Sequence, residues 1–282
     1  MLRLTREVRF AINTWTREIS DSKNGHAARP ALTGLGHYFE LQVTLTGPMD
    51  QKSSYLRNIK EIDSAVRTLA VPVVERAITE QTFGGGGNVC GDVFDAIKNA
   101  WPGAQLDRVV FRLSPYLSWS IESSSTMTNG TMTNSTMTNG KTPDSHTLKL
   151  SQRFEFSAAH RLHNPQLNDA ENQKTFGKCN NPNAHGHNYE VQVTIKGTPD
   201  SRGVLMPVGE LEKLVDTFAI EPLDHKHLNI EVPEFSGSTG LNPSVENIAM
   251  VIYKRLKPSL GNGLLDSVTV WETPKTWCEY RE

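Results

Sequence analysis

Three histidines and one cysteine in the second half of the sequence have types and spacings that suit a metal site. His185 and His187 flank a single glycine, six residues after Cys179, and His160 ends the upstream segment Phe-Ser-Ala-Ala-His. A β-strand alternates its side chains, so the first two of these imidazoles would point to one face and reach one ion. A third imidazole from a neighbouring strand would complete a facial set for Zn²⁺ and leave its fourth position open. The pattern therefore predicts a catalytic zinc site with its own reactive thiol.

The composition limits the classes of protein to which this chain can belong. Its 282 residues carry a formal net charge of -2, so there is no basic excess that would track a nucleic-acid backbone. Charged residues occur throughout the first ten positions, and no uncharged stretch approaches membrane-spanning length. The three cysteines make an odd count without a CxxC pair, which fits a reducing compartment. We expect a soluble, cytoplasmic protein with a small-molecule substrate and with neither nucleic acid nor membrane as partner.

A repetitive polar segment divides the sequence into two related halves. Residues 122–147 repeat Ser, Thr, Met, Asn and Gly, bury too little apolar surface to order themselves, and predict a flexible linker. On either side of it, residues 36–47 align without a gap with residues 186–197 and share Gly, His, Glu, Gln, Val, Thr and Gly. We therefore expect a tandem duplication with domains at 1–121 and 148–282.

The hydrophobic pattern predicts the elements that must position the histidines. For the second copy these are strands at 148–160 and 187–196, a helix at 211–218, a second helix that ends at 257, and a hairpin of strands at 265–272 and 276–281. The second helix is predicted to begin with Asn242 as N-cap and Pro243 in its first turn. The first copy repeats this order more loosely, with helices near 62–77 and 92–100. Each copy is thus predicted to be an α+β unit of order β-β-α-α-β-β, with two helices on one face of a four-stranded antiparallel sheet.

Four motifs occur together and in order in the second copy. They are Phe-Ser-Ala-Ala-His-Arg-Leu-His at 156–163, Gly-Lys-Cys-Asn-Asn-Pro-Asn-Ala-His-Gly-His-Asn-Tyr at 177–189, Pro-Leu-Asp-His-Lys-His-Leu-Asn at 222–229 and Val-Trp-Glu-Thr at 270–273. Over residues 148–282 the chain resembles the 6-pyruvoyl-tetrahydropterin synthase family. The resemblance implies the tunnelling fold, in which sheets join into a barrel on oligomerisation. It also implies conversion of 7,8-dihydroneopterin triphosphate to 6-pyruvoyl-tetrahydropterin with elimination of triphosphate.

The resemblance further implies a role for each residue of the site. His160, His185 and His187 are the implied zinc ligands, and Cys179 is the implied proton-abstracting base, with Asp224 and His225 as its partners. Glu272 is the implied pterin anchor, and Glu246 is a second pocket residue. The anchor is chemically reasonable because the two oxygens of a carboxylate match the 2-amino group and N3–H that a pterin presents side by side.

Each assignment has a structural alternative. Cys179 could be a small buried hydrophobe, Asp224 a capping residue in a solvated turn, and Glu272 a charged strand end. Glu246 could be a first-turn carboxylate favoured by the helix dipole. The activity itself has two alternatives: a 6-carboxy-tetrahydropterin synthase, which cleaves the side chain of the same substrate, and a catalytically silent zinc- or pterin-binding protein.

The first copy lacks most of these residues. Thr14 aligns with His160 and Leu35 with His185, so His37 alone remains of the three ligands, and one imidazole does not hold catalytic zinc. Leu113 aligns with Glu272. We therefore expect residues 1–121 to be a degenerate partner domain, and the chain to form a homo-oligomer in which three tandem chains mimic the family's hexamer.

Overall fold

The protein was analysed as a computed structural model that describes residues 2–14, 28–82, 86–123, 147–261 and 263–282. These residues form two compact units, one of Met1–Leu150 and Gly197–Leu205 and the other of Ser151–Lys196 and Met206–Glu282. The predicted linker falls almost entirely on 124–146, which lies outside the described residues. The flexible linker therefore stays a prediction.

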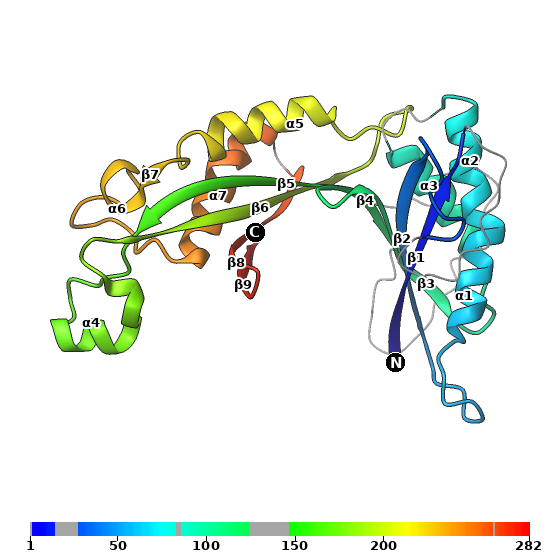
Figure 1. Ribbon diagram of the computed structural model, residues 1–282, viewed down its shortest axis with the longest axis horizontal. Helices are drawn as coiled ribbons and strands as arrows, with labels where there is room; N and C mark the ends of the chain where they lie inside the picture. The colour runs from blue at the N-terminus through cyan, green and yellow to red at the C-terminus, as the bar shows by residue number, and fades with distance from the viewer. Residues whose placement is uncertain (1, 15–27, 83–85, 124–146, 262) are drawn as a thin grey trace. The chain divides into compact units, whose positions relative to one another are not determined.

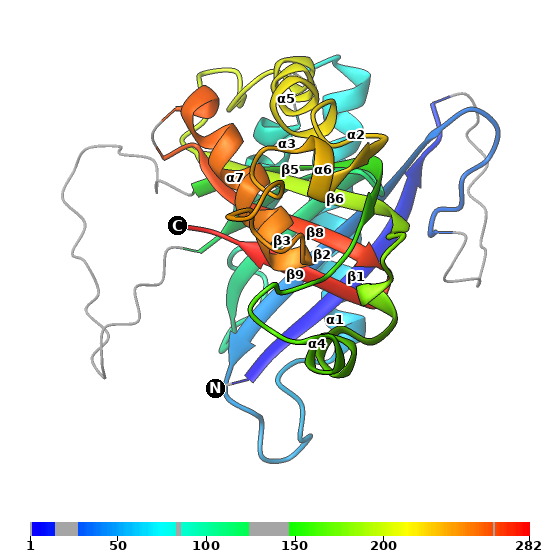
Figure 2. The same cartoon turned by 90° about the vertical axis from the view of Figure 1, so that its left-hand side faces the viewer.

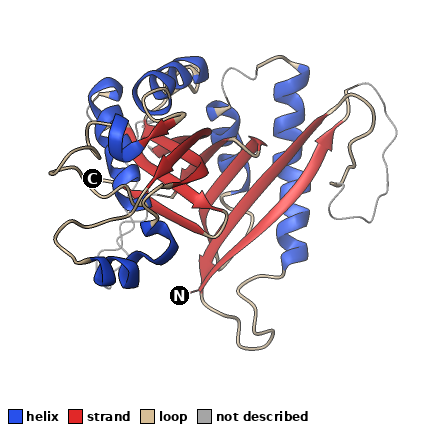
Figure 3. Ribbon diagram, turned by 60° about the vertical axis from the view of Figure 1, so that its left-hand side comes forward, coloured by secondary structure: helices blue, strands red, loops and turns tan. Residues whose placement is uncertain are grey.

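The first unit has the predicted β-β-α-α-β-β order. Its antiparallel strands lie in the order β1-β2-β3-β4. Their bounds are β1 (Leu2–Ile12), β2 (His37–Gly47), β3 (Gln105–Ser114) and β4 (Leu117–Glu122). The helices are α1 (Ile59–Ala65), the π turn η1 (Val66–Ala70), α2 (Val71–Thr79) and α3 (Gly87–Ile97). Figure 1 shows these helices together on one side of the first unit's strands, and Figure 3 shows the helix of α1, η1 and α2 running along them.

The second unit has the same order with four short additions, α4, η2, β7 and α6. Its principal strands lie in the order β5-β6-β8-β9, and β7 pairs in parallel with the end of β5. The strands are β5 (Thr147–His160), β6 (His185–Gly197), β7 (Lys226–His227), β8 (Leu265–Thr273) and β9 (Thr276–Tyr280). The helices are α4 (Asp169–Phe176), the 3-10 turn η2 (Gly177–Asn180), α5 (Val208–Val215), the π turn η3 (Asp216–Ile220), α6 (Leu228–Glu231) and α7 (Val245–Leu260). Figure 2 shows α7 lying across β8 and β9, against which it packs.

The strands of each unit bury the side chains that their alternating patterns predict. On β2 the side chains of Leu41, Val43 and Leu45 are fully buried, whereas the intervening Gln42 is only partly covered. In the second unit Val191, Val193 and Ile195 of β6 are likewise fully buried. Helical spacing supplies the opposing layer: Ile62, Val66, Ala70 and Val74 in one unit, and Ile248, Ile252 and Leu256 in the other, are all buried at 0% exposure.

The two copies share their irregularities as well as their order. Glu40 pairs with Arg112 across β2 and β3, and Glu190 pairs with Trp271 across β6 and β8. Bulges follow at the same places, between Arg112 and Ser114 in one copy and between Trp271 and Thr273 in the other. Each first helix also runs into a five-residue π turn, η1 or η3. Because bulges and π turns are uncommon local features, their repetition supports the predicted duplication.

The predicted start of the last helix is wrong by two residues. Helix α7 begins at Val245, and the side chain of Ser244 rather than Asn242 caps it by accepting from Asn247 N. Asn242 and Pro243 lie before the helix because they have other partners: Asn242 Oδ1 accepts from His163 N, and the Pro243 carbonyl accepts from His160. The helix then continues beyond residue 257 to Leu260, with Pro258 in its last turn.

An ion pair ties the segment after α6 to α7. Arg255 Nε and Nη2 donate to Glu234 Oε1 and Oε2 at 2.7 and 2.5 Å, and this bonding lowers the pKa of Glu234 below its usual 4.5. Because the folded pKa lies below the unfolded one, the pair stabilises the fold above about pH 4.5 and loses that effect as the pH falls through the lowered pKa. We expect Glu234→Gln to lower Tm by about 2–4 °C near neutral pH, and the difference to shrink in acid. Thermal unfolding across pH checks this, and a difference independent of pH would contradict it.

Candidate metal centre

The structure brings the three predicted histidines together at one end of the second sheet. His160 is the last residue of β5, and His185 and His187 open β6. One ring nitrogen from each lies within 4.8 Å of the others, and His160 Nε2 is 3.1 Å from His185 Nε2. Nitrogens bound at about 2.0–2.1 Å to one tetrahedral Zn²⁺ lie roughly 3.3 Å apart, so the separation of the His160 and His185 nitrogens is close to what an ion requires.

The surroundings of His160 fix its proton and keep the ring neutral. His160 is fully buried, and its Nδ1 lies 2.7 Å from the Pro243 carbonyl oxygen. A carbonyl only accepts, so Nδ1 carries the proton and the Nε2 lone pair faces the other imidazoles. Burial lowers the pKa of His160 to about 4. Burial and, as a smaller cause, the nearby His187 also lower the pKa of His185. Neutral imidazole is the form that binds a metal ion.

His187 completes the donor set. Its Nε2 is buried and has no hydrogen-bond partner among the described residues. An unpaired buried nitrogen is costly, and coordination to an ion would satisfy it. Within the described ranges, this triad is the group of His, Cys, Asp and Glu side chains whose geometry could hold a metal.

Glu272 lies directly beside the triad. It occupies the bulge of β8, and its Oε1 is 3.4 Å from His160 Nε2 and 3.6 Å from His187 Nε2. The same carboxylate borders a cavity of about 370 Å³ whose other lining residues are Arg153, Asn188, Glu190, Trp271, Thr273 and Pro274. A bulge re-aims a strand side chain, which explains how a residue near the strand end faces both the imidazoles and the cavity.

Cys179 lies in the turn that follows α4, close enough to Glu272 for that charge to act on its thiol. Leu162 N donates to the Cys179 carbonyl at 2.8 Å, and the buried side chain of Asn180 binds both Arg161 Nε and His163 Nδ1. Burial and then the charge of Glu272 raise the pKa of the Cys179 thiol. A nearby cation would lower it, so the thiol depends on positive charge at this centre to act as a base.

Asp224 and His225 pair with each other and attach to β5, but not to the cysteine. Asp224 Oδ2 is 2.7 Å from His225 Nδ1, while Asp224 Oδ1 accepts from Ser157 N at 2.8 Å. The Ser157 hydrogen bond and then His225 lower the pKa of Asp224. His225 has a positive φ of 56° and a side chain that is 82% exposed. No hydrogen bond or ion pair joins either residue to Cys179 in the part of the chain that the structure describes.

Glu246 is not brought to the triad. It lies exposed in the first turn of α7, where its charge contributes to a raised pKa of Cys278, after burial of that thiol. No contact between Glu246 and the three histidines occurs among the described residues. Its geometry therefore matches the alternative of a first-turn carboxylate.

Asn172 is a supporting residue that the sequence analysis missed. Fully buried on α4, its Oδ1 accepts from Asn164 N at 2.8 Å and its Nδ2 donates to the carbonyls of Asn164 and Leu167 at 3.0 and 2.9 Å. These bonds fold the loop between His160 and the cysteine turn. An asparagine preceding Pro165 looks like a turn residue, whereas nothing local marks Asn172 as buried.

We expect Asn172→Ala to destabilise the protein by roughly 2–4 kcal/mol, because the fully buried amide makes several hydrogen bonds to the backbone that are all lost. Denaturant unfolding measures this change. Gln173→Ala is the matched control, since Gln173 is exposed on the same helix and should leave stability within about 0.5 kcal/mol. Equal effects of the two substitutions would show that the buried bonds carry no special weight.

The first copy shows what is left when the ligands are replaced. Leu35 is 82% exposed, and His37 opens β2 at the place that His187 takes near the start of β6. Leu113 occupies the bulge of β3, as Glu272 does in β8. The described residues of the first copy thus hold one imidazole where the second copy holds three.

The second unit is therefore an α+β domain whose sheet carries a candidate metal centre and a carboxylate at one end, with a thiol in the turn that precedes β6. A family model described as 6-pyruvoyl tetrahydropterin synthase matches residues 149–282. The human 6-pyruvoyl tetrahydrobiopterin synthase is 42% identical over 134 residues, which span 47% of this chain and 90% of the human protein. The chain belongs to the 6-pyruvoyl tetrahydropterin synthase family.

Two further comparisons describe the range of this similarity. The 6-carboxy-5,6,7,8-tetrahydropterin synthase of Haemophilus influenzae is 28% identical over 152 residues, covering 48% of this chain and 99% of that protein. The solved structure of Caenorhabditis elegans 6-pyruvoyl tetrahydropterin synthase is 37% identical with a TM-score of 0.45, covering 48% of this chain and 96% of that one. No helix in the described ranges is both long and apolar enough to span a membrane.

Proposed function

We propose that residues 148–282 act as a zinc-dependent 6-pyruvoyl-tetrahydropterin synthase, a triphosphate-eliminating carbon–oxygen lyase. The observation that carries the proposal is the convergence of His160, His185 and His187 beside Glu272 and Cys179, within the segment that matches the family. The substrate is 7,8-dihydroneopterin triphosphate and the product 6-pyruvoyl-tetrahydropterin.

The donor set suits zinc. Three neutral imidazoles with an open fourth position are a common catalytic zinc site, and the unpaired His187 Nε2 fits such a role. When bound, zinc supplies Lewis-acid stabilisation of negative charge on a substrate oxygen. The Pro243 carbonyl accepts from His160 Nδ1 and so leaves the Nε2 lone pair of His160 available to a metal, as outer partners of metal-binding histidines do.

The protein's own side chains perform the proton transfers and the positioning. Cys179 Sγ, as thiolate, takes protons from the two hydroxyl-bearing side-chain carbons of the substrate in turn. One electron pair moves into the dihydropterin ring, which is reduced as the carbon beside it becomes a ketone, and the other expels triphosphate from the neighbouring carbon. Glu272 accepts hydrogen bonds from the 2-amino group and N3–H of the pterin ring. Asp224 holds His225 in one tautomer and so prepares it to relay a proton. Because His225 is highly exposed in the single chain, we assign the relay to a site completed by assembly.

Incubation of the purified protein with dihydroneopterin triphosphate tests this function. Triphosphate release with a pyruvoyl-pterin product, identified by mass spectrometry, is the expected result. A carboxy-pterin with acetaldehyde would instead identify the carboxy synthase, an alternative with which this chain also shares sequence similarity. Zinc binding without triphosphate release would indicate a silent binding protein.

Glu272→Gln is expected to weaken substrate binding by roughly 10–100-fold, because an ionised acceptor of two hydrogen bonds is replaced by a neutral amide. The increase should appear in KM, with zinc content unchanged. Glu279→Gln on β9 is the control, since its exposed carboxylate lies on the neighbouring strand and should leave KM unchanged. Loss of zinc in Glu272→Gln would instead make the carboxylate part of the metal site.

We also propose that residues 1–121 form a degenerate, metal-free domain, and that three chains assemble so that the tandem copies mimic a hexamer. Open sheet edges favour such joining. The three unbridged cysteines support a cytoplasmic location. Light scattering that shows a stable monomer would refute the assembly.

A further inference from the structure

The first copy contains a cavity of about 950 Å³ at the end of its sheet. It lies between the start of β2, the end of β3 and the last turns of α2, and its walls include Tyr38, Phe39, Glu40, Ala77, Ile78 and Arg112. This volume falls within the range of small-molecule binding sites. It also exceeds the cavity of about 370 Å³ beside Glu272 in the second copy.

The two cavities occupy corresponding positions. Because Glu40 pairs with Arg112 as Glu190 pairs with Trp271, the shared register matches Tyr38 to Asn188 and Leu113 to Glu272. Tyr38, Glu40, Arg112 and Leu113 line the first cavity, and the four matching residues line the second. The duplication has therefore kept a binding-sized space in the copy that lost the metal ligands.

The inner part of the first cavity is apolar and aromatic. Phe39 is 5% exposed and Ala77 7% exposed, and Ile78 and Leu113 extend the same surface. The Phe39 ring stacks on Phe111 with centroids 5.3 Å apart and is tilted against Phe10 at 5.6 Å. A wall of this kind accommodates a planar ring, because aromatic pairs stack favourably at such separations.

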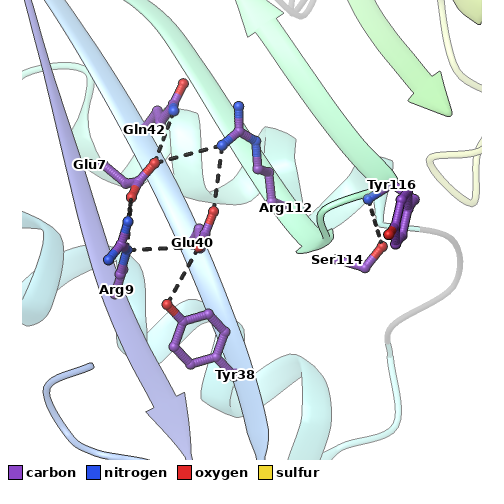
Figure 4. Close-up of polar contacts among 8 residues, drawn as sticks. All are labelled: Glu7, Arg9, Tyr38, Glu40, Gln42, Arg112, Ser114 and Tyr116. Atoms are coloured by element: carbon purple, nitrogen blue, oxygen red, sulfur yellow. Dashed lines mark hydrogen bonds and ion pairs between the residues drawn. The ribbon is translucent and has the colours of Figure 1, made fainter. Parts of the chain in front are cut away.

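One edge of the cavity carries a polar network whose charges cancel. Figure 4 shows Glu7 and Glu40 between Arg9 and Arg112, two carboxylates and two guanidinium groups. The contacts to Glu40 are long: 3.4 Å from Tyr38 Oη, 3.5 Å from Arg112 Nη1 and 3.7 Å from Arg9 Nε. Both Glu40 oxygens therefore keep capacity for stronger hydrogen bonds. Burial and then Glu40 raise the pKa of Tyr38, so its hydroxyl stays a donor.

We propose that this cavity binds, without a metal, one uncharged planar heteroaromatic molecule that directs hydrogen-bond donors at Glu40. The apolar wall selects a ring, the cancelled charges disfavour a charged ligand, and the carboxylate selects donors along one edge. Leu113 in place of a glutamate and the missing ligands exclude the chemistry proposed for the second copy. This inference rests on the proposed function only for the choice of test molecule: pterin is used because the proposed substrate of the second copy contains that ring.

Calorimetric titration of the full chain with pterin, combined with amide hydrogen exchange, tests the proposal. We expect a pterin site that protects backbone amides at 37–40, 77–81 and 112–115. Ile78→Trp fills the cavity and should abolish that protection, whereas Ile78→Ala leaves it open and should retain it. Glu40→Gln should weaken binding at this site by roughly 10–100-fold, the loss of a charged acceptor. Glu190→Gln, the matched substitution in the second copy, should leave the protection of these three segments unchanged.

Each alternative result would overturn the inference. Pterin that protects no first-copy segment, or that protects them equally in Ile78→Trp, would refute the cavity as its site. Quinoxaline, a flat bicycle without edge donors, should bind at least about ten-fold more weakly, and equal affinity would refute recognition by Glu40. Amide hydrogen exchange reports on each copy separately. Failure of the proposed synthase function can therefore be distinguished from failure of the proposed first-copy site.

Discussion

Replacing His187 with alanine is expected to remove the zinc and, with it, all but roughly 1% or less of the synthase turnover. A catalytic zinc needs its three protein ligands, and even the loss of an outer partner costs 10–100-fold in metal affinity or activity. The buried Nε2 of His187 has no hydrogen-bond partner among the described residues and lies 3.6 Å from Glu272 Oε1, so truncation removes the ligand atom without breaking a hydrogen bond of that atom. Metal analysis by mass spectrometry and triphosphate release measure the two losses.

The tandem copy supplies the matched control. His37→Ala removes the imidazole at the corresponding place near the start of β2, where no second or third imidazole is within reach among the described residues. Its zinc content should remain that of the wild-type chain. A second readout is thermal: added zinc should raise Tm in the wild type and in His37→Ala but not in His187→Ala, because a ligand stabilises only the fold that binds it. Zinc retained by His187→Ala would refute the triad.

The sheet and the triad could be predicted because they depend on periodic patterns. Alternating apolar residues determine which face of β6 is buried, and a separation of two residues puts His185 and His187 on one face. The predicted strand at 148–160 likewise corresponds to β5, with His160 at its end. The pairing register then brings His160 beside His185 and His187, since neighbouring strands must align their buried faces.

Features that depend on long-range partners could not be predicted in the same way. Asn242 and Pro243 have the sequence of a helix start, but their oxygens are taken by His163 and His160, and α7 begins later. Asn172 resembles any polar helix residue until its loop folds over it. The distance of Glu272 from the imidazoles arises from a bulge, which leaves no mark in a pattern with a period of two.

The resemblance gave the two carboxylates different roles, Glu272 as the pterin anchor and Glu246 as a second pocket residue, but it could not say how far each lies from the histidines. The structure separates them: Glu272 lies at the triad, whereas Glu246 lies exposed on α7 near Cys278. The Asp224–His225 pair is intermediate, since its own geometry is that of a catalytic pair but its imidazole faces solvent in the single chain. Its proposed role thus depends on assembly, whereas the three imidazoles of the candidate metal centre converge within one chain.

Cys179→Ala is expected to keep the zinc and lose turnover by about 10²–10⁴-fold, the usual contribution of a positioned general base. The thiol lies near Glu272, and burial with that charge raises its pKa, so its reactivity depends on the positive charge of the metal centre. Cys278→Ser is the control, because Cys278 is a partly buried thiol on β9 whose charge interactions are with Glu246 and Glu279. It should keep both zinc and turnover. Zinc and activity lost together in Cys179→Ala would make the thiol a ligand, and activity retained would transfer the base to another group.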